Sequence, residues 1–452
     1  MDDRLTRAVA GLHAGIAAVN KGDFATARAL FEESLALFRA AGDNAGTGWA
    51  LNNLGEIAAA QGDYTAARTL FEESLALRRA VGDLVQISWT LNNLGAVVGE
   101  QGEYALARRL FEESLDLRRA LGDRRGIAYA LYNLASVLAN LSDYPAARAL
   151  FEESLALRQQ LRDQPGTAWV MLSLGNIELM QNDYATARAS YDDALMTFRA
   201  AGMRDGIAWA LNNIGEVLYH QGYYAAAQAR FEESLALFRD TGSRLGIAWA
   251  LNNCGDTACQ QGDETGAHAL LEEGLMLARD MGNPRLIAWS LHSFGSLAVV
   301  NADRATARQL FDQSLSLRHS IGDRHGSTEC TISLGLLARA EGRLDQAQIL
   351  LKAGLAQSNA LGDRRMAAQA MAALVAVSFD RADVERAVCL AGATAALLDT
   401  VRAQIDRQYR APFEQAIAVA RTALGEQACT AAWEKGRQLS ADAAVTLALS
   451  GA

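Results

Sequence analysis

A tryptophan, two adjacent asparagines and an acidic residue recur together along the 452-residue chain. The stretch GIAWALNNIGEV holds one copy, formed by Trp209, Asn212, Asn213 and Glu216. Their i, i+3, i+4, i+7 spacing places the four side chains on one face of a helix. An asparagine amide carries both a donor and an acceptor, so a row of amides can pair with the backbone of an extended chain. Tryptophan adds flat apolar area with one N–H donor. The pattern therefore predicts recognition of a peptide.

The same positions return every 40 residues, although an asparagine inside a helix costs about 0.6 kcal/mol relative to alanine. The asparagine series is interrupted at Ser173 and fades at Ile332/Ser333 and Ala372/Ala373. We expect the set to line a concave peptide-binding groove. Its members are Trp49, Asn52, Asn53, Glu56, Trp89, Asn92, Asn93, Tyr129, Asn133, Trp169, Trp209, Asn212, Asn213, Glu216, Trp249, Asn252, Asn253, Asp256, Trp289 and His292.

A structural interpretation of the same residues stays open. Each tryptophan can pack between neighbouring repeats, and the second asparagine of each pair, the equivalent of Asn53, can bridge adjacent helices in a repeating hydrogen-bond ladder. Both interpretations can hold for one residue.

Catalytic patterns are missing from the sequence. The six histidines are scattered and none has HExxH spacing, and neither GxSxG nor GxxxxGK[ST] occurs. The five cysteines form no CxxC pair, which is typical of small core residues in a reducing compartment. We therefore expect no enzyme activity, no cofactor and no metal site.

Bulk properties narrow the class of protein. The net charge of −10 argues against direct binding of nucleic acid. No apolar run reaches 18 residues, and the start MDDRLTRAVAG lacks the apolar core of a signal peptide, so a cytoplasmic protein without a membrane partner is expected. Most basic residues are arginines, which we expect on solvated helix faces, as we do the acids Glu72 and Glu73.

A forty-residue repeat must position the groove residues. The pentapeptide FEESL begins at residues 31, 71, 111, 151 and 231. Apolar spacing predicts two helices in each repeat, for example near 44–60 and 64–80. Between them, Gly62 is expected as a left-handed cap and Asp63 as the cap of the second helix, which Gly82 should end.

The repeat resembles the tetratricopeptide repeat (TPR). Leu54, Gly55, Ala67, Phe71 and Ser74 match its LG…A…F…A signature, with serine at the last position. The usual period is 34, and here six extra residues lengthen the helices. The chain is also similar to the TPR arrays at the C-terminal end of bacterial STAND and LuxR-type signalling ATPases. The resemblance implies an all-α, right-handed TPR superhelix (α-solenoid) with first helices on its concave side.

The repeat frame sets the expected domain boundaries for about ten hairpins. They are a degenerate N-terminal unit over 1–42, eight 40-residue units over 43–362, a degenerate unit over 363–400, and capping helices with a tail over 401–452. In the last range we expect helices at Phe413–Leu424 and Gln427–Gln438. Leu424, Ala428 and Trp433 are expected to cover the exposed apolar end of the array.

The predicted function is a protein–protein interaction scaffold or regulatory sensor arm that holds a peptide segment of a partner in the concave groove. Two alternatives stay open. One is a sensor of a small molecule or peptide signal within a transcriptional regulator, which a ligand would stabilise against heat. The other is a self-associating structural spacer.

Overall fold

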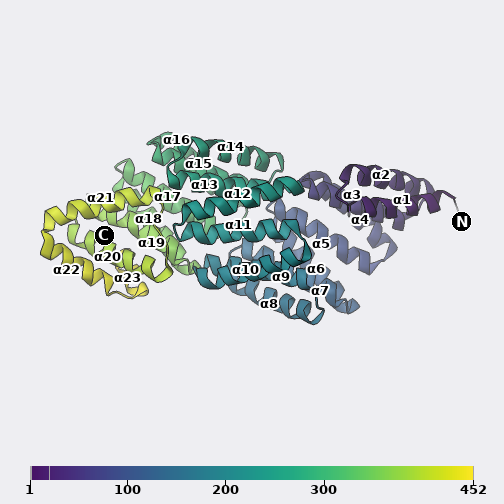
Figure 1. Cartoon of the computed structure of the whole chain (residues 1–452), viewed down its shortest axis with the longest axis horizontal. Coiled ribbons are helices and arrows are strands. Elements are labelled where there is room, and N and C mark those ends of the chain that lie inside the picture. The colour runs from purple at the N-terminus through teal and green to yellow at the C-terminus, as the bar shows by residue number, and fades with distance from the viewer. Residues whose placement is uncertain (1–2, 20, 451–452) are drawn as a thin grey trace. The chain divides into compact units, whose positions relative to one another are not determined.

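Every regular element that the computed structural model describes is an α-helix (Figure 1). The structure describes residues 3–19 and 21–450. The predicted ranges 1–42 and 401–452 begin and end at residues outside this described part. The all-α expectation is confirmed, and the helices form a solenoid of consecutive hairpins.

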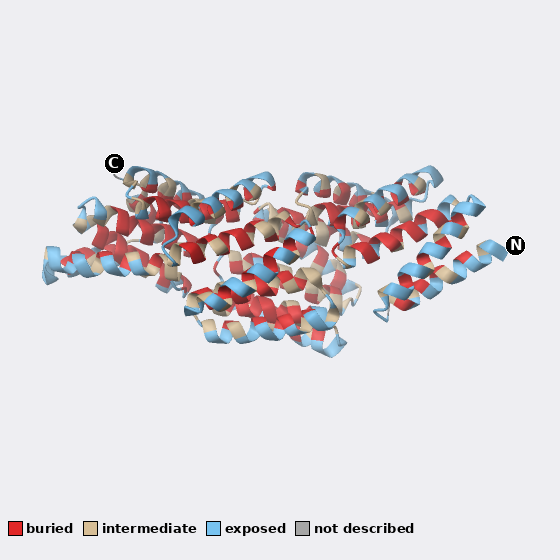
Figure 2. Cartoon of the chain, turned by 90° about the horizontal axis from the view of Figure 1, so that it is seen from above, coloured by how far each residue is buried: buried red, intermediate tan, exposed pale blue. Residues whose placement is uncertain are grey.

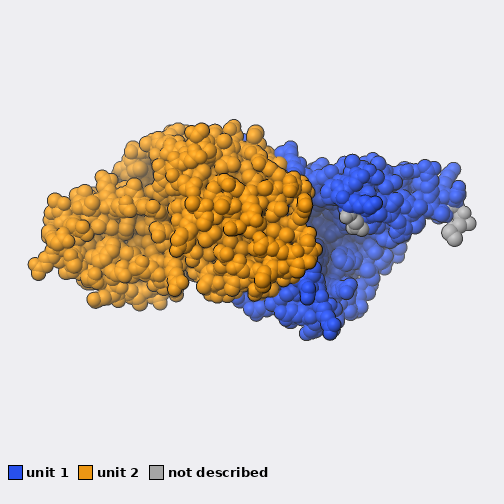
Figure 3. All heavy atoms as spheres, viewed as in Figure 1, with its two compact units in different colours: residues 1–170, 243–245, 279–284 blue, residues 171–242, 246–278, 285–452 orange. Residues whose placement is uncertain are grey.

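The chain divides into two compact units (Figure 3). Unit 1 comprises residues 1–170, 243–245 and 279–284, and unit 2 comprises residues 171–242, 246–278 and 285–452. The proposed division into repeat domains at 42, 362 and 400 is a different partition of the chain and stays a prediction.

The helices alternate as first and second members of the forty-residue repeats, so that odd-numbered helices up to α19 are first helices and even-numbered helices up to α20 are second helices. They are α1 (Asp3–Val19), α2 (Phe24–Ala41), α3 (Asn44–Ala60), α4 (Tyr64–Val81), α5 (Leu84–Glu100), α6 (Tyr104–Leu121), α7 (Arg124–Asn140), α8 (Tyr144–Gln160), α9 (Gln164–Met180), α10 (Tyr184–Ala201), α11 (Arg204–His220), α12 (Tyr224–Thr241), α13 (Arg244–Gln261), α14 (Glu264–Asp280), α15 (Pro284–Val300), α16 (Arg304–Ser320), α17 (Arg324–Ala340), α18 (Leu344–Leu361), α19 (Arg364–Asp380) and α20 (Val384–Val401).

Turn chemistry fixes where the helices begin and end. Gly82 ends α4 at φ +78°, a left-handed conformation that suits glycine, and Gly62 adopts φ +75° between α3 and α4. The Asp63 carboxylate accepts a hydrogen bond from the Ala66 N–H at 3.0 Å and so satisfies one of the free donors at the start of α4. The predicted helices near 44–60 and 64–80 are confirmed to within a residue.

Each hairpin closes on its signature residues. A Cβ placed on Gly55 would lie 2.7 Å from Cε1 of Phe71, so only glycine lets the ring reach the first helix. The buried Ser74 hydroxyl donates to the Gly48 carbonyl at 2.7 Å, which pins α4 to α3. Figure 2 shows the resulting buried faces turned toward neighbouring helices and the exposed faces turned outward. Serine therefore occupies the last signature position because it bonds the first helix.

Hydrogen bonds also join hairpins that lie far apart in the sequence. In unit 1, Arg244 donates to the Gln61 carbonyl at 3.0 Å across 183 positions. In unit 2, the Arg365 N–H donates to Asn182 Oδ1 at 3.0 Å, again across 183 positions. Within each unit, helix ends about four and a half repeats apart are therefore held in direct contact.

The frame breaks after α20, where three helices follow. They are α21 (Arg407–Leu424), α22 (Glu426–Arg437) and α23 (Ala441–Leu449). Helix α21 starts at Arg407, before the predicted Phe413. Pro412 lies inside the helix, where it removes one hydrogen bond without ending the helix. Helix α23 was not anticipated from the sequence.

The cap is formed by α22 lying on α20. A Cβ on Gly436 would meet the Cys389 carbonyl oxygen at 1.9 Å, so these backbones touch. Leu424 and Trp433 pack on the apolar cluster there, as expected. Ala428 does not, because it is exposed and its neighbour Cys429 takes the buried position. The expectation for Ala428 was one residue out of register.

Candidate peptide-binding face

Three aromatic side chains are exposed on consecutive first helices of unit 1. Trp49 on α3, Trp89 on α5 and Tyr129 on α7 have 43 %, 40 % and 38 % of their surface exposed. The rings of Trp89 and Tyr129 are 5.9 Å apart. The guanidinium of Arg118, on α6, lies 4.2 Å from the centre of the Trp89 ring, a cation–π contact that supports the ring from below.

Several arginines are buried, contrary to the expectation of solvated faces. Arg118 is completely buried, and its guanidinium reaches Asp123 at 3.2 Å and the Ser114 hydroxyl at 3.3 Å. Burial lowers the pKa of Arg78, its equivalent on α4, to about 10. The signal that could have revealed these arginines is the repeat frame, in which the same buried position holds phenylalanine in other hairpins. The series is Phe38, Arg78, Arg118, Arg158, Phe198, Phe238, Ala278, Arg318 and Ser358.

The asparagines of unit 1 bond to one another across adjacent first helices. Asn93 on α5 donates to Glu56 on α3 at 2.9 Å, and Asn52 donates to the same carboxylate at 2.8 Å. Asn133 on α7 donates to Asn92 Oδ1 at 3.1 Å. The Asn92 Nδ2 group is buried without a partner, and alanine occupies the acid position of that helix. We call such a set of side-chain hydrogen bonds between adjacent first helices a rung: where the acid is present, as at Glu56, it accepts from both asparagines.

Unit 2 repeats this rung and adds the tryptophan to it. Asn253 on α13 donates to Asn212 Oδ1 at 3.1 Å and to Glu216 at 3.2 Å, and Asn212 donates to Glu216 at 3.0 Å. The Trp249 Nε1–H donates to the same carboxylate at 3.2 Å. Burial raises the pKa of Glu216, which the three donors only partly offset. The carboxylate thus ties two helices together through three side chains.

The next rung of unit 2 is built on a shorter acid. The Trp289 Nε1–H donates to Asp256 at 2.9 Å, while the Ser290 hydroxyl donates to Asn252 Oδ1 at 2.9 Å. Burial raises the pKa of Asp256 to about 7, although the nearby Ser293 hydroxyl and the Trp289 N–H favour the charged form. The predicted groove residue His292 is buried, and its Nε2 lies 3.0 Å from the Ser333 hydroxyl.

The tryptophans of unit 2 also stack on one another. Trp209, Trp249 and Trp289 form two edge-to-face contacts, with ring centres 5.9 Å and 5.1 Å apart. Trp209 also meets Phe238 edge-on at 5.0 Å. These rings therefore pack between neighbouring repeats, and Asn93, Asn133 and Asn253 form hydrogen bonds between adjacent first helices.

The predicted set is thus brought together within each unit, from Trp49 to Trp169 in unit 1 and from Trp209 to His292 in unit 2. Asn213 donates to Asn176 at 2.9 Å, so that pair forms a rung without an acid. Asn53 instead donates to the Trp49 carbonyl of its own helix at 2.8 Å. Most side-chain amides of this set are already hydrogen-bonded within the protein. Peptide binding by the set stays a prediction.

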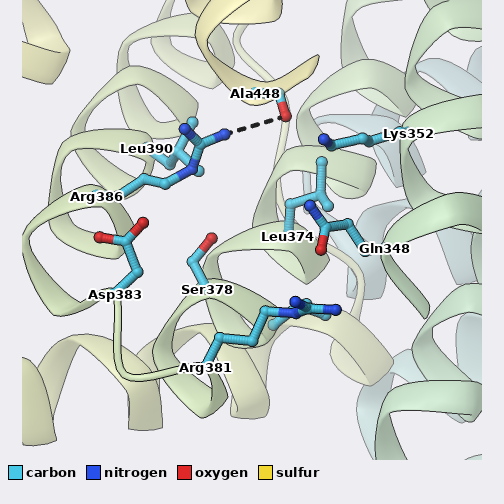
Figure 4. Close-up of a pocket in the computed structure, with 10 residues that line it drawn as sticks. Gln348, Lys352, Leu374, Ser378, Arg381, Asp383, Arg386, Leu390 and Ala448 are labelled. Carbon is cyan, nitrogen blue, oxygen red and sulfur yellow. Dashed lines mark hydrogen bonds between the residues drawn. The ribbon is translucent and has the colours of Figure 1, made fainter. Parts of the chain in front are cut away.

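Two small cavities were not foreseen from the sequence. One, of about 50 Å³, lies in unit 2 beside Asp256, His292 and Tyr409. The other, of about 80 Å³, has Lys352, Arg381 and Arg386 on its rim (Figure 4). Arg386 donates to the carbonyl groups of Leu447 and Ala448 at 2.8 Å and 3.5 Å, and cations at a helix C-terminus stabilise it. This second site therefore serves to hold α23.

Neither a cluster of metal ligands nor a membrane-spanning helix is found in the part of the chain that the structure describes. In it, no three His, Cys, Asp or Glu side chains cluster as metal ligands would. None of its helices is both long and apolar enough to cross a bilayer. The five cysteines are buried and unpaired with one another.

Comparison with known proteins agrees with the fold. The tetratricopeptide repeat model matches residues 7–80, 48–120, 86–160, 126–200 and 206–280, together more than half of the chain. No curated protein matches.

Three solved structures share the fold at low sequence identity. A Rap protein complexed with Competence and Sporulation Factor is 13 % identical, with a TM-score of 0.60 over 78 % of this chain and 98 % of that one. The Rap conjugation gene regulator of plasmid pLS20, in complex with the Phr* peptide, is 15 % identical, with a TM-score of 0.53 over 63 % and 76 %. The apo form of RapI is 11 % identical, with a TM-score of 0.50 over 60 % and 97 %. The chain belongs to the tetratricopeptide repeat family.

Proposed function

We propose that the chain is a protein-interaction module that binds a peptide segment of a partner against its first helices. The observation that carries the proposal is the exposed row of Trp49, Trp89 and Tyr129 in unit 1. Exposed aromatic rings on consecutive helices are typical of protein contact surfaces, because they offer large rigid contact area at low entropic cost. Two of the solved structures with this fold are complexes, one with Competence and Sporulation Factor and one with the Phr* peptide, which is consistent with the proposal.

The chemistry of this surface favours apolar contact over amide pairing. Asn52 donates to Glu56 on its own helix, and Asn93 and Asn133 donate to side chains of the preceding first helix, which leaves the rings as the groups facing outward. Val85, one helical turn before Trp89, is 46 % exposed and extends the apolar surface. The partner segment is therefore one that presents proline, aromatic or branched aliphatic side chains, and the asparagine ladder keeps the aromatic rings at fixed spacing.

A peptide-display selection against the purified chain tests this function. Peptides that bind should lose affinity by about tenfold or more when Trp49 and Trp89 are both changed to alanine, because buried aromatic anchors carry about 2 kcal/mol or more of binding free energy. Met196→Ala, a change at an exposed apolar residue on the second helix α10, is the matched control and should leave the affinity unchanged. Equal affinity for the tryptophan variant, with its helical content intact, would remove this face from the function.

Two other roles give different results in the same preparation. A peptide-signal sensor of a transcriptional regulator would use the same face, and a small-molecule sensor would show a raised melting temperature with a metabolite and no selected peptide. A structural spacer would show a molar mass that rises with protein concentration in light scattering and would not respond to Trp49→Ala.

A further inference from the structure

A short segment of the chain leaves the helical repeat and lies against unit 2. We call residues 403–409 the linker segment: its first four residues are non-helical and its last three begin α21. Ala403, Ile405 and Tyr409 are buried, with Tyr409 only 1 % exposed. The residue before the segment, Arg402, adopts φ +52°, which turns the chain sharply at the end of α20.

Backbone groups of the linker segment are recognised by helix ends. The Gln404 N–H donates to the carbonyl of His220, the last residue of α11, at 3.3 Å. The Arg407 N–H donates to the side-chain Oε1 of Gln260 on α13 at 2.8 Å. A side-chain amide thus binds main chain in the way expected of the asparagine ladder, but from a different position of the first helix.

Side chains of the segment make a second layer of contacts. Asp406 pairs with Arg365 at 3.1 Å and accepts from Gln369 at 2.5 Å, both on α19. Arg407 donates to the Cys259 carbonyl at 3.2 Å and to Glu264 at 3.4 Å.

The tyrosine at the end of the segment reaches a fourth first helix. The hydroxyl of Tyr409 lies 3.0 Å from that of Ser333 on α17. The segment is therefore held by an acid, then a base, then, after one residue, a tyrosine. Its contacts spread over α11, α13, α14, α17 and α19.

The residues that hold the segment are departures from the repeat. Glu264 replaces a tyrosine that begins five earlier second helices, Tyr64, Tyr104, Tyr144, Tyr184 and Tyr224. Ser333 stands where Asn253 stands two repeats earlier, and Gln369 stands where Trp289 stands. Each change supplies a group that bonds the segment. The fading of the tryptophan–asparagine pattern thus coincides with a surface that binds the linker segment.

The fit is incomplete at one position. The Oε1 atom of Gln408 is buried without a hydrogen-bond partner beside the 50 Å³ cavity, and a buried unsatisfied acceptor is destabilising. A chain with a different side chain there would fit better. The linker segment therefore fills this surface but leaves one buried acceptor without a hydrogen bond.

We propose that the linker segment is an intramolecular occupant of a peptide-docking surface on unit 2, and that the segment of a partner protein which replaces it has the order acid, base, any residue, tyrosine, with a non-helical chain up to the acid and a helical turn from the base onward. This inference rests on the proposed peptide-binding function and adds a second surface to it, separate from the exposed rings of unit 1. A tethered segment has an effective concentration in the millimolar range, so it keeps free peptides out until its own contacts are weakened.

Fluorescence anisotropy of a labelled peptide with the sequence RAQIDRQYRA tests the proposal on the full chain. The wild type should show little binding, because its surface is filled. The variant Asp406→Ala/Arg407→Ala, which loses the contacts with Arg365, Gln369 and Glu264, should bind the peptide at least about tenfold more tightly. Adding Arg365→Ala on the receiving helix should abolish that gain.

Matched changes separate this result from general loosening. Arg437→Ala, which removes an exposed pair with Asp399 outside the segment, should leave the wild-type result unchanged. A peptide with alanine in place of its aspartate should not bind the double variant. If the double variant does not fold, Asp406→Asn is the milder substitute, because it keeps an acceptor for Gln369 and loses only the charge.

The proposal is overturned if every folded variant fails to bind the peptide, or if the alanine peptide binds equally well. Either result would make residues 403–409 a fixed connection between α20 and α21. The outcome is independent of the tryptophan test in unit 1, so failure of one surface can be told from failure of the other.

Discussion

The same repeat positions build an open face in unit 1 and a closed one in unit 2. Trp89 rests on a buried arginine and is 40 % exposed, whereas Trp209 meets the buried Phe238 and Trp249 and is half-buried. In unit 2 the carboxylates of Glu216 and Asp256 also fix the indole N–H groups. The position in the repeat therefore sets where a side chain lies. The residues that pack around this side chain determine whether a partner can reach it.

The residue that packs against the tryptophan ring differs between the two sites: it is Arg118 at Trp89 and Phe238 at Trp209. Exchanging this residue has the largest expected effect on stability. Phe238→Arg should lower the free energy of unfolding by about 3–5 kcal/mol, because it buries a charge without a partner. The arginines at this repeat position, Arg78, Arg118, Arg158 and Arg318, are each followed five residues later by an aspartate, but residue 243 is serine. Thermal unfolding of the purified variant measures the loss.

The reverse exchange should be mild. Arg118→Phe places an apolar ring in a completely buried site and should change stability by about 1–2 kcal/mol at most, since apolar replacements of buried ion pairs are often neutral. A loss as large as that of Phe238→Arg would mean that the pair of Arg118 with Asp123 stabilises the fold by more than a buried apolar ring can replace.

Asp256, the acid that accepts from Trp289 in unit 2, predicts that the stability of the fold depends on pH. The pKa of Asp256 is raised to about 7 in the folded chain, above its value of 3.8 in a model compound. The folded state therefore holds a proton that the unfolded state has lost, so stability falls as pH rises from about 4 to 7 and stays low above it. Asp256→Asn should remove this decline, with a gain of a few kcal/mol at most at pH 8 and little change at pH 4.

Melting temperatures at pH 4, 6 and 8 check this prediction. The asparagine introduced by Asp256→Asn would still accept from the Trp289 N–H, so the rung itself is preserved. Glu56→Gln is the control from unit 1, where the acid is exposed and a smaller change of slope is expected. Parallel pH profiles for wild type and Asp256→Asn would contradict the burial of this proton.

Much of the fold was available from the sequence because it is encoded locally and repeated. Gly62, Asp63 and Gly82 set the helix ends, and the small residue Gly55 facing Phe71 closes the hairpin. The predicted helices and the tetratricopeptide fold followed from these signals. Ala428 was misplaced because the forty-residue frame no longer applies after residue 400.

The candidate site was harder to predict because it depends on contacts between repeats. Spacing placed Asn52 and Glu56 on one face of the same helix, where they bond, but only the neighbouring helix decides that Asn93 also donates to Glu56. The contacts of Arg365 with Asp406 join residues 41 positions apart across a break in the repeat, and no periodic signal marks them. Sequence periodicity thus located the face without revealing which of its groups are free.

The smallest expected effect concerns a contact that both units share. Ser234 in unit 2 and Ser114 in unit 1 each donate from a buried hydroxyl to a carbonyl of the first helix, both at 2.8 Å. Ser234→Ala should cost about 1 kcal/mol, the usual net value of one such bond. Ser114→Ala should cost somewhat more, because Ser114 also accepts from the Arg118 guanidinium at 3.3 Å and its loss leaves a buried charged donor less satisfied. Chemical denaturation of the two variants in parallel measures this difference, and equal losses would show that Asp123 and the Trp89 ring stabilise the buried arginine without the serine.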